Sequence, residues 1–166
     1  MKRIAYILLF SLLLISCGTR SGYFKMEGRF LHMNQGELYV YSPDGGIAGL
    51  DTIKIEAGRF SYEKPCSKPS TLIIIFPNYS TQPIFAESGE AVEVKADASH
   101  LKEMEVEGTE DNELMTKFRK QIASVSPPEE LKYAIAFIND HPESAVSAYL
   151  LNRYLVQTES PDYKQA

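Results

Sequence analysis

Two cysteines provide the only thiols in this 166-residue chain, and their positions predict different chemistry. Cys17 follows a basic start and an apolar run from Ile4 to Ile15, the pattern of a secretory signal over residues 1–16. Cys66 lies alone in a turn-like Pro-Cys-Ser-Lys-Pro segment. A lone thiol in an oxidising compartment is either reactive, forming a mixed disulfide with a partner, or a shielded small side chain. Because the chain contains no Cys-x-x-Cys pair, it cannot run dithiol chemistry by itself.

The residues around Cys17 resemble the lipobox of bacterial lipoproteins. Leu14, Ile15 and Ser16 precede the cysteine, and in such proteins the thiol is acylated and the peptide bond before it is cut. The apolar run covers twelve positions, whereas a membrane-spanning helix needs roughly 20. The resemblance implies a mature protein that begins at a lipid-bearing Cys17, with residues 17–22 as a short tether. An ordinary signal peptide with a chance cysteine is the alternative.

Histidines and carboxylates do not form a recognisable catalytic or metal-binding motif. The three histidines are far apart in sequence and lack metal-ligand spacing: His32, His100 and His141. Three alternating glutamates are expected to be an exposed strand face, although a cation site is conceivable: Glu103, Glu105 and Glu107. We therefore predict no catalytic residue, no metal site and no cofactor.

Tyrosines offer the best candidate for ligand binding. Four of them, together with Phe76, can gather at one end of a β domain: Tyr39, Tyr41, Tyr62 and Tyr79. A tyrosine-rich patch is a common way to hold a sugar or a peptide. The alternative is that these tyrosines border a β core and keep their hydroxyls in water.

The charge balance excludes some classes of partner. Without Lys2 and Arg3, which leave with the signal, the chain has 15 basic and 22 acidic side chains, a net charge near −7. This charge disfavours nucleic acid and offers no polybasic patch to anionic lipid. Membrane attachment is therefore expected through acyl groups, and stable anchoring needs more than one chain.

Residues 23–108 have the two-residue period of half-buried strands. The clearest hairpin is residues 51–63, where Ile53 and Ile55 share one face and Phe60 and Tyr62 continue it. Thr71 to Phe76 is apolar on both faces, so we expect a central strand. Residues 84–87 and 91–95 are expected to pair around Ser88 and Gly89. About eight closely spaced strands predict a mainly β fold, an antiparallel sandwich or a barrel.

Residues 109–166 have a helical period instead. An apolar stripe recurs at three- and four-residue spacing: Leu114, Met115, Phe118, Ile122 and Val125. Ser126 and Glu129 form a capping box for a second helix, and Ser144 begins a third. Ser160 and Pro161 look like a further helix start. We therefore expect a helical segment that is truncated before another domain.

Several short motifs, in order, resemble a domain of unknown function that begins exported lipoproteins of Gram-negative bacteria. They are Leu50 to Thr52, Ala57 to Tyr62, Phe85 to Glu90 and Val106 to Asn112, followed by a helix like that of His141 to Leu151. In those proteins a thioredoxin-like domain of the peroxiredoxin or thiol-disulfide oxidoreductase type follows, with a Trp-Cys-x-x-Cys site. The present chain has no tryptophan and no such pair, so the resemblance transfers no catalytic residue.

Together these patterns predict a non-enzymatic lipoprotein that positions a thioredoxin-like protein or its client. The alternative is a stand-alone lipoprotein that binds a glycan or peptide through the tyrosines. The position after Cys17 is not aspartate, and the tether lacks an acidic cluster. It therefore resembles neither inner-membrane retention signals nor surface-export signals, which leaves a periplasm-facing protein on the outer membrane as the expected location.

Overall fold

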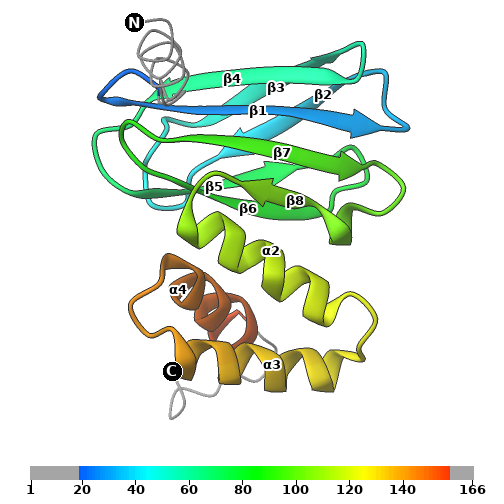
Figure 1. Ribbon diagram of the computed structural model, residues 1–166, viewed down its shortest axis with the longest axis vertical. Coiled ribbons are helices and arrows are strands. Elements are labelled where there is room, and N and C mark those ends of the chain that lie inside the picture. The colour runs from blue at the N-terminus through cyan, green and yellow to red at the C-terminus, as the bar shows by residue number, and fades with distance from the viewer. Residues whose placement is uncertain (1–18, 158–166) are drawn as a thin grey trace, which may run out of the picture.

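The computed structural model describes residues 19–157 (Figure 1). The predicted signal peptide, the predicted lipidation site Cys17 and the predicted helix start at Ser160 lie outside these residues. In the described part no helix is both long enough and apolar enough to span a membrane.

Eight strands form one mixed sheet that curls into a nearly closed barrel (Figure 1). Along the sheet the strand order is β6-β5-β2-β3-β4-β1-β7-β8, so β6 and β8 border the seam of the barrel. The strands are β1 (Tyr23–Leu31), β2 (Gln35–Tyr41), β3 (Leu50–Glu56), β4 (Arg59–Pro65), β5 (Ser70–Ile75), β6 (Thr81–Ala86), β7 (Ala91–Asp97) and β8 (Glu105–Glu107). This architecture confirms the mainly β fold of about eight strands.

Alternating side chains fill the inside of the barrel, as the two-residue period predicts. On β1, Phe24, Met26 and Phe30 are buried while the residues between them are more exposed. Gly28 faces the same interior, and its missing side chain leaves room for the Phe60 ring of β4. The β3–β4 hairpin turns at Ala57 and Gly58, which both have positive φ.

Two predictions of strand pairing are wrong. β6 and β7 do not pair around Ser88 and Gly89, because β6 pairs with β5 while β7 pairs in parallel with β1. The Gly89 amide donates to Tyr23 O (2.8 Å), and the Lys25 amide donates to Glu90 O (3.1 Å), so the turn guides β7 alongside β1. The sheet is therefore mixed rather than wholly antiparallel, and β5 lies next to the edge strand rather than at the centre.

Three helices and a π-helical turn follow the barrel: α2 (Glu110–Ile122), α3 (Pro127–Asp140), α4 (Ala145–Leu151) and η3 (Asn152–Val156). A 3-10 turn, η2 (Leu101–Glu103), precedes β8. The helices share a second apolar cluster with Phe85 of β6, built mainly from Met115, Phe118, Phe137, Val146 and Leu150. The predicted capping box of Ser126 and Glu129 is present, and Ser144 caps α4.

Helix α2 closes the seam of the barrel through three buried polar side chains, Asn112, Thr116 and Arg119. Asn112 accepts from the Phe85 amide (3.0 Å) and donates to its carbonyl (2.7 Å) on β6. The Thr116 hydroxyl accepts from the Val106 amide (2.9 Å) and donates to the Val106 carbonyl (3.0 Å) on β8. Edge strands expose unpaired amides and carbonyls, and these side chains satisfy them. The barrel and the helices are thereby joined.

Candidate functional site

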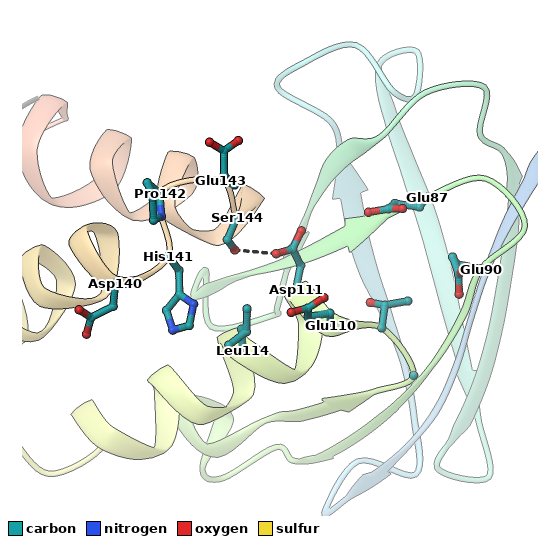
Figure 2. A pocket seen from close by; sticks show the side chains of 12 residues that line it. Glu87, Glu90, Glu110, Asp111, Leu114, Asp140, His141, Pro142, Glu143 and Ser144 are labelled. Carbon is teal, nitrogen blue, oxygen red and sulfur yellow. Dashed lines mark hydrogen bonds between the residues drawn. The ribbon is translucent and has the colours of Figure 1, made fainter.

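An open acidic cleft lies between the barrel and the helices (Figure 2). Its volume is about 710 Å³, and it lies between the β6–β7 turn, the start of α2 and the loop from α3 to α4. The Ser144 hydroxyl donates to Asp111 (2.6 Å) and ties α4 to α2 at this place. Six carboxylates line the cleft: Glu87, Glu90, Glu110, Asp111, Asp140 and Glu143.

The acidic cleft offers negative charge but no preformed ligand set. Within residues 19–157 no three histidine, cysteine, aspartate or glutamate side chains are arranged to hold a metal ion. His141, the basic residue of the wall, packs against the Phe137 ring with 4.6 Å between ring centres. The cleft therefore favours contact with a cationic surface through long-range attraction.

The tertiary structure brings two histidines together that are distant in sequence. His32 Nδ1 lies 2.9 Å from Asp97 Oδ1, and His100 Nδ1 lies 3.8 Å from Asp97 Oδ2. Two hydrogen bonds lower the pKa of Asp97 to about 2: the bond with His32 has the larger effect, and the bond from the Ser99 amide has the next largest. All three residues lie at the end of the barrel where β1 and β7 finish, on the surface, and they brace these strand ends.

The predicted tyrosine face is only partly assembled. Tyr39 and Tyr41 point outward from β2, opposite Ile75 and Ile73 of β5, so they form an outer patch with apolar neighbours. Tyr79 is 88% exposed in the β5–β6 turn. Tyr62, in contrast, is a core residue with 5% exposure, and its hydroxyl donates to Asp51 (3.2 Å).

Tyr62 therefore does not belong to the tyrosine face. The physical reason is the strand period, which puts Tyr62 on the same side of β4 as Phe60, inside the barrel. Burial raises the pKa of the Tyr62 hydroxyl, and the charge of Asp51 raises it further. Phe76, considered with these tyrosines, is likewise in the core.

Cys66 lies in the segment between β4 and β5, and its side chain is buried. Its Sγ donates to Lys68 O (3.3 Å), and the Cys66 amide donates to Gly22 O (2.8 Å). Burial raises the pKa of the thiol, so little reactive thiolate is present at neutral pH. This geometry favours the shielded side chain over the reactive thiol.

We expect native Cys66 to react with a thiol reagent about 100-fold more slowly than in the unfolded chain, because the reagent must wait for opening and deprotonation. The measurement is the rate of alkylation by iodoacetamide, with and without urea, in a Cys17→Ser background. The rate should rise with pH in both states, because the thiolate is the reactive form, and in the native state the rise should extend to higher pH, because burial raises the pKa of the folded thiol. Equal rates in both states would mean that the thiol is accessible.

Sequence reasoning missed the buried polar side of α2. Asn112, Thr116 and Arg119 follow one another at four- and three-residue spacing, so they lie on one helix face. That face also contains the buried Met115 and Phe118. The available signal was polar residues recurring within an apolar stripe, which calls for buried partners.

A comparison with protein-family models matches residues 24–115 to the family described as domain of unknown function (DUF4369). The match takes in all eight strands except the first residue of β1, and it ends inside α2. A comparison with curated proteins finds no match.

Proposed function

The chain belongs to the DUF4369 family, and from this premise we propose that it is an exported lipoprotein whose barrel and helices form a non-catalytic interaction domain. Its role is to hold a thioredoxin-like redox protein, or the client of one, at a fixed place near a membrane. The proposed location is the periplasmic side of the outer membrane. The proposed anchor is acylated Cys17.

The observation that carries this proposal is the closure of the barrel seam by α2. Because Asn112 bonds to β6 and Thr116 bonds to β8, the helices cannot move independently of the barrel without exposing unpaired backbone groups. A partner bound by the helices would then keep a defined orientation to the barrel. Positioning is a function that needs this kind of stiffness.

The contacts of the tether support a defined orientation to the membrane as well. The Gly22 amide donates to Ser88 Oγ (3.0 Å), and Gly22 O accepts from Cys66. Gly22 lies only five positions after Cys17, so an anchor at Cys17 can lie no further than roughly 18 Å from this end of the barrel. Ser88 lies between Glu87 and Glu90 of the acidic cleft, which would place the cleft at the membrane-proximal end.

We expect Cys17→Ser to move the protein from the membrane fraction to the soluble fraction of a Gram-negative host. The reason is that the acyl chains are the proposed source of membrane affinity. Fractionation and mass spectrometry of the amino-terminal peptide measure the result. Cys66→Ser, which removes the other thiol, is the matched control and should stay membrane-bound. If the protein with native Cys17 had an unprocessed amino terminus without an acyl adduct, the proposal would be contradicted.

The interaction role is tested with the same lipidated protein. In-cell crosslinking from the helices should capture an exported protein with a thioredoxin-like fold or its client, identified by mass spectrometry. Purified protein should give no turnover in an insulin-reduction assay. Turnover by the purified chain, or crosslinks only to unrelated proteins, would overturn the proposal.

A second candidate function rests on the outer patch of the barrel. Tyr41 lies opposite Leu50, which is 61% exposed, and both Tyr39 and Tyr41 lie opposite isoleucines of β5. Exposed aromatic rings beside aliphatic side chains suit a glycan or a peptide. If this candidate is right, a ligand from a glycan or peptide array should raise the melting temperature, and the Tyr39→Ala/Tyr41→Ala variant should lose that effect. Tyr133→Ala, at an exposed tyrosine of α3, is the control.

A further inference from the structure

A second, smaller cavity lies where β6, α2, α3 and the end of α4 meet. Its volume is about 110 Å³. Three cationic side chains line it, with two tyrosines and one carboxylate: Lys102, Arg119, Arg153, Tyr149, Tyr154 and Glu130. The wall is therefore positively charged, unlike the protein as a whole.

Arg119 is the buried member of this set, with 3% of its surface exposed. None of the aspartates and glutamates of residues 19–157 forms an ion pair with it. Burial lowers the pKa of Arg119 to about 10, so the guanidinium still carries its charge at neutral pH. A buried charge without a counter-charge is costly, and the cost falls if an anion comes close.

The neutral partners of Arg119 do not use its full donor capacity. Nε donates to Gln82 (2.9 Å), Nη2 to Pro83 O (3.0 Å), and Nη1 to Met104 O (3.2 Å) and Thr116 (3.4 Å). A guanidinium has five N–H groups. One N–H of Nη2 is therefore left without a hydrogen bond to the described residues.

Further donors lie around the same space. Tyr149 and Arg153 line the cavity, and the Arg153 guanidinium carbon lies 5.8 Å from the centre of the Tyr154 ring. The Tyr154 hydroxyl donates to Glu130 (3.1 Å), so this hydroxyl already engages the one carboxylate of the wall. With three cations against Glu130, the wall keeps an excess of two positive charges.

We propose that this cavity binds one carboxylate group, which the buried Arg119 and the half-buried Tyr149 hold together with the exposed Arg153 and Lys102. The small volume admits a carboxylate with little more than its attached carbon atoms. A guanidinium N–H and a tyrosine hydroxyl are suitable donors for its two oxygens. The carboxylate belongs either to a small organic acid or to the end of a peptide chain.

Calorimetric titration of the purified protein tests this site with acetate, with acetamide as the uncharged isostere, and with sodium chloride at matched ionic strength. Acetate should bind, while acetamide and chloride should not. Arg153→Gln and Lys102→Gln change exposed side chains, and the unfolding midpoint of each variant is measured to check that it folds. Arg153→Gln should weaken acetate binding by about tenfold, as expected when one charge-assisted hydrogen bond is lost. Lys117→Gln changes a residue of α2 that does not line the cavity, so acetate binding should be unchanged in this variant.

A second arm separates the two sources of the carboxylate. N-acetyl-alanyl-alanine with a free carboxylate is compared with its amide. Tighter binding of the peptide acid than of acetate assigns the site to a peptide terminus, and equal or weaker binding assigns it to a small acid. Equal binding of acetate and acetamide, or unchanged binding in both glutamine variants, would overturn the proposal. Inorganic phosphate that binds more tightly than acetate would also overturn the carboxylate assignment.

Discussion

Replacing Arg119 with alanine is expected to lower the free energy of unfolding by about 3 kcal/mol or more. The guanidinium bridges the two sides of the seam, because it donates to Pro83 O on β6 and to Met104 O just before β8. Without the guanidinium, these buried carbonyls and the Gln82 side chain lose their donor. The truncation also leaves a cavity where the Arg119 side chain was. Urea unfolding followed by far-ultraviolet circular dichroism measures the change.

Two further variants of α2 separate the roles of charge and geometry. Arg119→Lys keeps the charge but lacks the planar guanidinium that reaches three acceptors. Its loss of stability should therefore lie between zero and the loss in Arg119→Ala. Lys117→Ala, two positions away on the exposed side of α2, should change the free energy of unfolding by no more than about 0.5 kcal/mol. If Arg119→Ala were as mild as Lys117→Ala, α2 would not be needed to close the barrel.

Replacing Gly108 with alanine is expected to cost about 2–4 kcal/mol of unfolding free energy. Gly108 joins β8 to α2 with φ +117, a conformation that residues with a side chain rarely adopt. A Cβ at this position would also lie 2.5 Å from the Ala91 carbonyl oxygen, which is backbone and cannot move aside easily. The chain would have to shift where α2 enters the seam.

The matched control for this substitution is Gly89→Ala. Gly89 also has a positive φ (+88), but a Cβ there would have no heavy atom within 4 Å beyond its chain neighbours. It should therefore show only the backbone cost, about 1 kcal/mol. Thermal and urea unfolding of both variants give the comparison. Equal losses in the two variants would mean that the contact with Ala91 has no energetic weight.

These two predictions bear on the proposed function, because both concern how firmly α2 holds the helices to the barrel. A variant that loosens α2 but leaves the barrel folded should weaken partner crosslinks from the helices. Membrane attachment through Cys17 should persist, since the proposed anchor lies before the barrel in the chain. The interaction and anchoring roles can therefore be separated experimentally.

Local patterns in the sequence were enough to predict the strands and the helices. The two-residue period of Phe24, Met26 and Phe30 depends only on which side of a strand must be buried, and the structure confirms it. The capping box of Ser126 and Glu129 is equally local, because its partners are three residues apart. The same period implied that Tyr62 shares a face with Phe60, which the tyrosine-face prediction did not use.

Only the tertiary structure decided which strands meet and what closes the barrel. Whether β7 pairs with β6 or with β1 depends on hydrogen bonds between residues far apart in sequence, such as Gly89 with Tyr23. In the same way, His32 and His100 meet at Asp97 only because β1 and β7 end side by side.

The sequence by itself determined the mainly β domain and the helical segment after it, because each leaves a signal within a few neighbouring residues, whereas the export signal at its start stays a prediction. It did not determine the role of Asn112, Thr116 and Arg119, since a polar residue on a helix normally faces water. These three are buried because α2 lies against two strand edges whose backbone groups need partners. That need arises only when the sheet has curled and brought β6 and β8 to the same seam.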